Sequence, residues 1–219
     1  MSRDADLIRD RRAQYESAGL DVGDVADDPI EQWLRWHAGA HAAGVAEPNA
    51  MVVCTIDPDG QPSARTLLVR GVDDAGFTFF TNYDAPKSLD LESNSKVAAV
   101  FAWLDLHRQV RIVGNAARIP SEESDAYFAG RPRGSQIGAW ASPQSKVIAD
   151  RAALDARVAH YAAKFAGQET IPRPPNWGGW RIVPSEFEFW QGRPDRLHDR
   201  LRYRRPDAAA AWTVERLAP

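Results

Sequence analysis

The sequence is poor in cysteine, since Cys54 is the only one among 219 residues. A single thiol cannot form an intrachain disulfide, and it leaves no cysteine pair to hold a metal or to act as a redox couple. A reducing compartment suits such a chain. Cys54 lies in the apolar run Ala50–Ile56, where a small buried hydrophobe is the expected role.

Long apolar runs are absent as well. Residues 1–28 mix charges with short apolar stretches, so we predict neither a signal peptide nor a membrane span, and we expect a cytoplasmic protein with a flexible N-terminal arm over 1–28. The net charge of -3, from 27 basic and 30 acidic side chains, gives no general attraction to nucleic acid or to an anionic membrane. Any bound anion must therefore be held by a local cluster of basic residues.

Several common catalytic motifs are missing. The chain has no G-x-G-x-x-G after a strand, no G-x-x-x-x-G-K-[ST], no H-E-x-x-H and no G-x-S-x-G. These absences remove the usual support for nucleotide hydrolysis, zinc peptidase and serine hydrolase functions. The five histidines lack ligand-like spacing, so we expect no metal site.

What is present is an ordinary globular composition, 44% hydrophobic and 26% charged, which predicts one compact domain over residues 29–219. A helix is predicted to begin at Pro29 with Asp28 as its N-cap. Its expected apolar face follows helical spacing and comprises Ile30, Trp33, Leu34, His37 and Ala38.

Short β-branched and aromatic runs separated by turn residues dominate the rest of the chain. Strands are expected over Ala50–Ile56, Ala64–Arg70, Phe77–Thr81, Val97–Trp103, Gln109–Val113 continuing into Ala116–Ile119, Trp180–Val183, Phe187–Trp190, Leu201–Arg204 and Trp212–Leu217. Helices are expected around Lys87–Ser93, from Ser121 to about Gly130, and over Arg151–Phe165. The short gaps suit antiparallel hairpins, so the predicted fold class is α+β, an antiparallel barrel with peripheral helices.

One segment concentrates cationic side chains. Arg196, His198 and Arg200 alternate with other residues, so an extended strand would place all three on one face, suited to an anionic or planar ligand. On composition alone, a solvated edge strand with its charges facing water is the better interpretation.

The exact order of residues reverses that preference. Phe187-Glu188-Phe189-Trp190-Gln191, followed after four residues by Arg196-Leu197-His198-Asp199-Arg200, resembles the C-terminal signature of the pyridoxamine 5'-phosphate oxidase family. The resemblance runs from about Asp28 to the end of the chain and leaves out the N-terminal arm. Other blocks agree in the same order: Glu47 to Val52, Arg65 to Arg70, Phe79 to Asn82, Arg108 to Val110, Arg131 to Trp140, Gln144-Ser145, Trp177 to Gly179 and Arg216 to Pro219.

The resemblance implies an FMN-binding split β-barrel that forms a homodimer, with two FMN molecules in clefts at the subunit interface. Arg65 and Lys87 can neutralise a phosphate, while hydroxyl and amide groups suit the polar flavin edge. Carried onto this sequence, the positions that contact FMN are Arg65, Thr66, Leu67, Leu68, Val69, Arg70, Phe80, Thr81, Lys87, Gln109, Gln144, Ser145, Trp190 and Arg200.

The resemblance also implies a site for a phosphorylated vitamin B6 substrate. The substrate phosphate is expected among Arg70, Tyr127, Arg131 and Ser135, and the pyridine ring among Arg196, Leu197 and His198. Arg196 and His198 are the catalytic candidates, as groups that orient the ring and stabilise charge. Because Tyr127, Arg131 and Ser135 are spaced by four, they fit one side of a helix that continues past Pro132 or bends there.

Strand parity adds one expectation. Positions 65 and 70 differ by an odd number, so Arg65 and Arg70 are predicted to face opposite ways unless a bulge intervenes, which suits two separate phosphates.

The implied reaction oxidises pyridoxamine 5'-phosphate or pyridoxine 5'-phosphate to pyridoxal 5'-phosphate, with molecular oxygen as acceptor and hydrogen peroxide as product. Three positions depart from the commonest family pattern: Arg70, where lysine is usual, Phe80, where tyrosine is frequent, and Pro86, where a basic residue is frequent. We expect altered affinities at a working site. Two alternatives stay open: a related flavin oxidase with another substrate, as in phenazine pathways, and a split-barrel protein that binds flavin or heme without turnover.

Overall fold

The structure is a computed structural model that describes residue 15, residues 19–207 and residues 209–219. The chain forms two compact units that are each assembled from separate segments. Unit 1 comprises residues 1–48, 100–112 and 185–219, and unit 2 comprises residues 49–99 and 113–184. Most of the predicted N-terminal arm, residues 1–14 and 16–18, lies outside the described residues.

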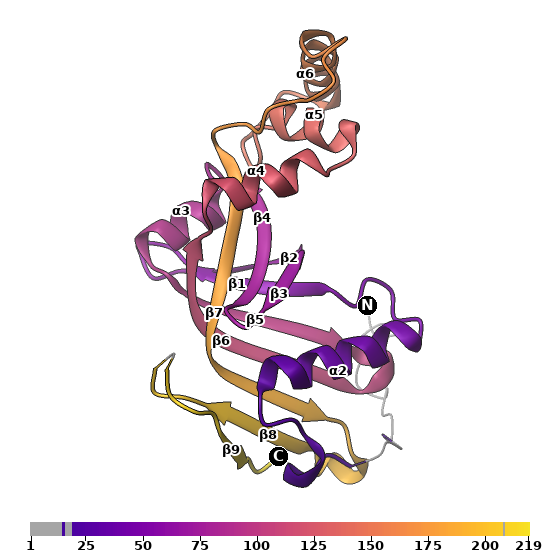
Figure 1. The fold of residues 1–219 in the computed structure, drawn as a ribbon, viewed down its shortest axis with the longest axis vertical. Coiled ribbons are helices and arrows are strands. Elements are labelled where there is room, and N and C mark those ends of the chain that lie inside the picture. The colour runs from indigo at the N-terminus through magenta and orange to yellow at the C-terminus, as the bar shows by residue number, and fades with distance from the viewer. Residues whose placement is uncertain (1–14, 16–18, 208) are drawn as a thin grey trace, which may run out of the picture. The chain divides into compact units, whose positions relative to one another are not determined.

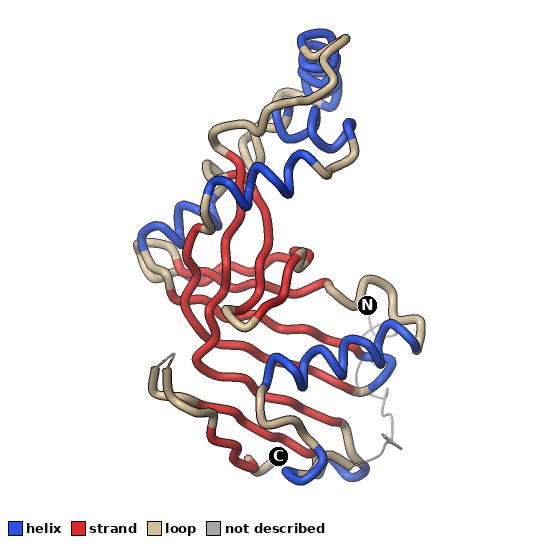
Figure 2. Tube along the Cα trace, viewed as in Figure 1, coloured by secondary structure: helices blue, strands red, loops and turns tan. Residues whose placement is uncertain are grey.

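Within the described residues, nine strands form one sheet (Figures 1 and 2). Its strand order is β2-β1-β5-β6-β7-β4-β3, and β8 pairs with both β7 and β9. The pairs β1/β2, β3/β4, β4/β7, β7/β8 and β8/β9 are antiparallel, as predicted. The strands are β1 Ala50–Ile56, β2 Pro62–Leu68, β3 Gly71–Asp73, β4 Gly76–Asn82, β5 Lys96–Trp103, β6 Arg108–Arg118, β7 Trp177–Gln191, β8 Asp199–Arg204 and β9 Thr213–Arg216.

Unit 2 contains four helices within its described residues: α3 Pro86–Ser93, α4 Ser121–Ala129, α5 Arg133–Ala141 and α6 Arg151–Lys164. A small core of this unit consists of Phe128, Phe165, Ile171 and Trp177, with Tyr127, Trp140 and Tyr161 packed against it. Burying these large apolar and aromatic side chains fixes α4, α5 and α6 against the start of β7.

Unit 1 contains the helix predicted from Pro29. It is α2, Pro29–Ala42, and the Asp28 carboxylate accepts hydrogen bonds from the backbone N–H groups of Ile30 at 2.7 Å and Glu31 at 3.2 Å, as an N-cap does. The predicted apolar face is only partly right, because Leu34 is 46% exposed whereas Trp36 is buried. Trp36 packs edge-on against Phe189 of β7, with ring centroids 5.3 Å apart.

Several details of local structure differ from the interpretation of the sequence. The segment through Arg196 and His198, for which an extended strand was considered, is instead a short 3-10 turn, Pro194–Arg196, and β8 begins only at Asp199. Asp195 and Arg196 have positive φ angles of 56° and 62°, which an extended strand does not allow. Arg196, His198 and Arg200 therefore do not share one strand face.

The parity argument for Arg65 and Arg70 also fails, because β2 ends at Leu68 and Arg70 lies beyond it. The chain leaves β2 through Val69, whose N–H bonds the Asn49 carbonyl at 3.0 Å, and the Arg70 N–H bonds the Thr78 carbonyl at 2.8 Å.

The helix predicted from Ser121 to about Gly130 is confirmed, and the helical path breaks at Pro132 instead of continuing as one helix through Tyr127, Arg131 and Ser135. The first helix, α4, ends at Ala129, and α5 begins at Arg133 after Pro132, so Arg131 lies between two helices. Proline lacks the N–H that a continuing helix requires and is tolerated near a helix start. Farther along, the two strands predicted around residues 180–190 are one strand, β7.

Candidate active site

A buried lysine in unit 2 lies among several predicted cofactor residues. Lys87 Nζ is 3.1 Å from Gln144 Oε1 and 3.3 Å from Thr81 Oγ1, and the Thr81 hydroxyl donates to the same Gln144 oxygen at 2.9 Å. Lys87 is only 8% exposed and forms no ion pair within the described part of the chain. Pro86, one of the departures from the family pattern, begins α3 and so sets the start of the helix that carries Lys87.

A second cation faces the same region. Arg65 Nη1 donates to Thr55 Oγ1 at 2.7 Å, and the Thr55 hydroxyl donates to Asp90 Oδ2 at 2.6 Å. Burial lowers the pKa of Lys87, repulsion from Arg65 lowers it further, and Asp90 opposes the shift. Two cations that repel each other favour a bound anion, because an anion would relieve both the repulsion and the cost of burial.

The other predicted cofactor residues of unit 2 lie on or next to these elements. Thr66 is exposed, Leu67 and Leu68 are half-buried in β2, and Val69 is buried just beyond it. Ser145 follows Gln144 in an exposed loop with a positive φ of 66°.

The predicted substrate-phosphate residues form a second cationic group in unit 2. Burial lowers the pKa of Arg131, and repulsion from Arg70 lowers it further, whereas Tyr127 raises it. Arg131 Nη1 is buried and has no hydrogen-bond partner among the described residues. A buried guanidinium nitrogen without a partner is costly, so this atom suits an anionic acceptor from a ligand.

Two of these residues line a cavity of about 260 Å³, and a residue that was predicted to contact the cofactor lines it as well. Arg131 and Ser135 line it together with Gln144, which also contacts Lys87. The remaining lining residues are Asn82, Gly138, Ala139, Ser142 and Trp177. Asn82 and Trp177 were not predicted, because only the pairing of β4 with β7 places them opposite each other.

Aromatic rings stack beside this cavity. Phe80, predicted at the cofactor, stacks on Tyr127, predicted at the substrate, with centroids 3.7 Å apart and planes 7° from parallel. Trp177 lies 5.5 Å from Phe80 and 6.2 Å from Tyr127, again nearly parallel. Phenylalanine at position 80 thus packs against Tyr127 through its face, which needs no hydroxyl.

Unit 1 carries the remaining predicted residues. Gln109 and Trp190 line a cavity of about 620 Å³ with Tyr15, Leu104, Asp105, His107 and Arg108. The His198 ring lies 4.6 Å from the Trp190 ring, and Arg200 is the partner of Trp190 in the β7/β8 register. The structure therefore groups Gln109, Trp190, His198 and Arg200 within this unit. Arg196 and Leu197 are exposed.

The protonation state of His198 follows from its contacts. Its Nδ1 accepts a hydrogen bond from the Arg193 backbone N–H at 3.1 Å, so Nδ1 carries no proton. Burial lowers the pKa of His198, and the nearby charge of Arg196 lowers it further. The ring is thus a neutral imidazole that presents its Nε2–H as a donor.

A buried carboxylate holds Arg200. Glu188 Oε1 accepts from Arg200 Nε at 2.7 Å, while Glu188 Oε2 accepts from Arg111 Nη2 at 3.0 Å. Burial alone would raise the pKa of Glu188, but its bonds and charge interactions with Arg200 and Arg111 lower it overall. Sequence reasoning missed this role of Glu188, although the residue lies in the motif that identified the family.

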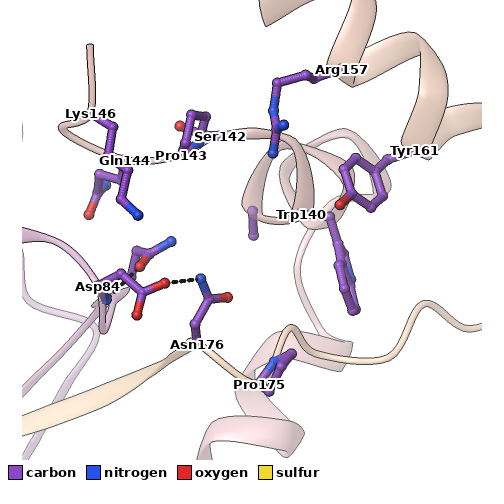
Figure 3. Close-up of a pocket in the computed structure, with 12 residues that line it drawn as sticks. Asp84, Trp140, Ser142, Pro143, Gln144, Lys146, Arg157, Tyr161, Pro175 and Asn176 are labelled. Carbon is purple, nitrogen blue, oxygen red and sulfur yellow. Dashed lines mark hydrogen bonds between the residues drawn. The ribbon is translucent and has the colours of Figure 1, made fainter. Parts of the chain in front are cut away.

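Another cavity of unit 2, about 350 Å³ in volume, contains only one predicted residue, Gln144. Figure 3 shows its lining, in which Asn176 donates to Asp84 at 2.6 Å. Trp140, Arg157 and Tyr161 line it from α5 and α6.

No helix in the described residues has both the length and the apolar character that a bilayer span requires.

Comparison with known proteins places these features in a family. The model of the family described as pyridoxamine 5'-phosphate oxidase matches residues 38–190, and the model described as pyridoxine 5'-phosphate oxidase C-terminal dimerisation region matches residues 177–219. A pyridoxine/pyridoxamine 5'-phosphate oxidase of Salinibacter ruber is 53% identical over 219 residues, 100% of both chains. One of Burkholderia vietnamiensis is 54% identical over 213 residues, 97% of this chain and 99% of its own.

Solved structures agree. PhzG from Burkholderia lata 383, in complex with tetrahydrophenazine-1-carboxylic acid, matches with a TM-score of 0.86 and 32% identity over 94% of this chain and 100% of its own. An FMN-binding protein related to pyridoxamine 5'-phosphate oxidase, from Nostoc punctiforme, matches with a TM-score of 0.71 over 89% of this chain and 100% of its own; at 16% identity it supports the fold alone.

The fold is therefore the split β-barrel, in agreement with the predicted fold class, and the protein is an oxidoreductase. The chain belongs to the pyridoxamine 5'-phosphate oxidase family.

Proposed function

We propose that the protein oxidises pyridoxamine 5'-phosphate and pyridoxine 5'-phosphate to pyridoxal 5'-phosphate, with FMN as cofactor, oxygen as acceptor and hydrogen peroxide as product. With the amine substrate, water is also consumed and ammonia is released. The observation that carries the proposal is the cavity in which Arg131, with its unpartnered Nη1, and Ser135 meet Gln144. This cavity combines side chains suited to an anion with Gln144, a residue predicted to contact FMN.

The donor set of unit 2 fits FMN. Lys87 and Arg65 supply two positive charges for a phosphate dianion, and Lys87 forms no ion pair within the described residues. Thr81 and Gln144 supply hydroxyl and amide groups. Bound FMN would supply the two-electron chemistry that no protein side chain provides.

The protein's own residues would bind and orient the substrate. Arg131, Arg70 and Ser135 would hold its phosphate, and the neutral His198 would donate from Nε2 to a polar atom of the pyridine ring. Arg196 would add positive charge near that ring. None of these groups is required to remove a proton.

We further propose that the functional protein is a homodimer with FMN at the subunit interface, so that each site draws on both chains. The match of residues 177–219 to a dimerisation region supports this. Sedimentation of the purified protein with and without bound flavin would test it, and a monomer that keeps its flavin would contradict it.

A second substrate class has support of its own. PhzG, at 32% identity, was solved with tetrahydrophenazine-1-carboxylic acid, whose carboxylate is also an anion that an arginine could bind. Arg131 and Ser135 favour a phosphate because several donors can share its three oxygens.

One experiment separates these possibilities. The purified protein should be yellow and release FMN on denaturation. Anaerobic mixing with pyridoxine 5'-phosphate should bleach the flavin, and readmitted air should restore the colour with formation of hydrogen peroxide. Bleaching by a reduced phenazine carboxylate alone would favour the second substrate class. A flavin that neither compound bleaches would indicate a protein that binds without turnover and would overturn the proposal.

A further inference from the structure

We infer that Trp177 is a positioning residue, which holds the guanidinium of Arg131 in the orientation that receives the substrate anion. The inference rests on the proposed function, because it concerns the same anion site. Trp177 is 7% exposed and begins β7, where it pairs with Asn82 of β4. It lines the same cavity as Arg131.

The contact that supports the inference is between a cation and an aromatic face. The Arg131 guanidinium carbon lies 4.5 Å from the centroid of the Trp177 ring and 5.8 Å from that of Phe128. The side chain of Arg131 has no hydrogen bond or ion pair within the described residues, and it follows α4 in a break between helices. An arginine that no carboxylate anchors depends on these rings for its orientation.

The indole is itself fixed. It packs with Phe128, Phe165 and Ile171 in the small core of unit 2, and the Trp177 backbone N–H bonds the Pro174 carbonyl at 3.1 Å. The backbone is also closely packed at the next residue, Gly178, because a Cβ added there would lie 2.1 Å from the Tyr83 hydroxyl oxygen. A rigid ring can therefore fix a flexible cationic side chain at little further cost in entropy.

The arrangement also explains why a partly buried arginine beside another arginine persists. Burial lowers the pKa of Arg131, and repulsion from Arg70 lowers it further, so the charged guanidinium is costly where it lies. The electron-rich face of Trp177 offsets part of this cost without supplying a hydrogen-bond acceptor. Arg131 Nη1 therefore stays available to a ligand, which a carboxylate partner would prevent.

The test uses the flavin-loaded protein with Trp177→Leu, which removes the aromatic face and keeps an apolar side chain, and Trp177→Phe, which keeps a smaller face. We expect Trp177→Leu to raise KM for pyridoxine 5'-phosphate on the order of fivefold with kcat nearly unchanged, and Trp177→Phe to raise it less. The inhibition constant of inorganic phosphate should rise by the same factor, and FMN affinity should not change.

Trp180→Leu is the matched control, since Trp180 is a similarly buried tryptophan of β7 whose face meets another arginine, Arg118. It should lower thermal stability without raising KM. If Trp177→Leu does not fold, a double-mutant cycle that combines Trp177→Phe with Arg131→Met tests the inference instead. In the Arg131→Met background, Trp177→Phe should have no further effect on phosphate inhibition.

The outcomes separate the inference from the proposed function. Unchanged KM and phosphate inhibition in the Trp177 variants of an active enzyme would overturn the inference alone, as would equal effects in both backgrounds of the cycle. A wild-type protein that binds inorganic phosphate but oxidises no B6 phosphate would overturn the proposed function, and phosphate binding, followed by calorimetry, would still decide the role of Trp177. A wild-type protein without either property would overturn both.

Discussion

The backbone N–H of Arg193 donates to Nδ1 of His198 at 3.1 Å. This bond requires a lone pair on Nδ1, so protonation of the imidazole would break it. The pKa of His198 lies below its ordinary value of 6.5, first because of burial and then because of Arg196. The neutral form is therefore the one that the fold supports.

This predicts the pH dependence of the reaction. If neutral His198 orients the substrate, kcat/KM should stay constant as the pH falls to about 6.5 and decline only below it, where the imidazole gains a proton. His198→Asn should lower kcat/KM on the order of 10- to 100-fold and remove that acidic limb. If kcat/KM of His198→Asn still declines at the same acidic pH as in the wild type, the group that titrates is not His198.

Lys87 leads to a prediction in which cofactor affinity and stability move in opposite directions. Lys87→Met should weaken FMN binding on the order of 10- to 100-fold, because a charge-assisted bond to the phosphate is lost. The same change should stabilise the apoprotein, since the pKa of Lys87 is lowered and its buried charge therefore costs folding free energy. Flavin fluorescence titration and apoprotein melting would measure the two effects.

The control for that prediction is Lys87→Arg, which keeps the charge and should retain part of the affinity. A Lys87→Met protein that loses both FMN affinity and apoprotein stability would show that the lysine is structural.

Glu188 should contribute stability that depends on pH. Because its pKa is lowered from 4.5, its contribution is present above that pH and is lost as the pH falls through the lowered pKa. Glu188→Gln should reduce the free energy of unfolding near neutral pH by about 1–3 kcal/mol, less than for a fully buried pair because Arg200 and Arg111 are partly exposed. Denaturant unfolding at several pH values would measure it.

The difference between wild type and Glu188→Gln should shrink as the pH falls below 4.5. Glu215→Gln is a suitable comparison, since Glu215 also pairs with an arginine, Arg202, but at the surface. An equal loss in both variants would argue against a special role for the buried carboxylate.

The sequence predicts the strands well where the pattern is local. The run Ala50–Ile56 is a strand with those bounds, and Asp28 caps the helix that begins at Pro29. Alternation does not reveal positive φ angles, so it predicts a strand where the structure turns at Asp195 and Arg196. The helix α5 was expected only as a continuation or bend past Pro132, without bounds of its own, because its start has no side-chain cap and its sequence contains two glycines, which weaken a helix pattern.

The candidate site residues were predicted from the family motif, whereas the further residues that the structure adds depend on contacts between distant segments. Glu188 meets Arg111 only because β6 and β7 are neighbours in the sheet. Trp177 meets Arg131 because the chain returns to the end of α4 after passing through α5 and α6, a separation that no spacing rule covers.

The final prediction concerns Arg70, which stands where the family usually has lysine. The charge of Arg70 acts on Arg131, so the two side chains form one cationic group within the proposed substrate-phosphate site. Arginine offers a planar fork with several donors, whereas lysine offers a compact charge, so the exchange changes geometry and keeps charge. Arg70→Lys should therefore change KM for pyridoxine 5'-phosphate several-fold, with a smaller effect on kcat, as steady-state kinetics would measure.

Two controls make the Arg70 prediction specific to the phosphate. Unphosphorylated pyridoxine lacks the group that Arg70 would bind, so its weak turnover should be the same in Arg70→Lys and wild type. Arg151→Lys makes the same exchange at an exposed position, where the arginine pairs with Asp155 one helical turn away. It should change KM neither for the phosphorylated nor for the unphosphorylated substrate. An Arg70→Lys enzyme with unchanged KM for the phosphorylated substrate would show that Arg70 does not grip the phosphate.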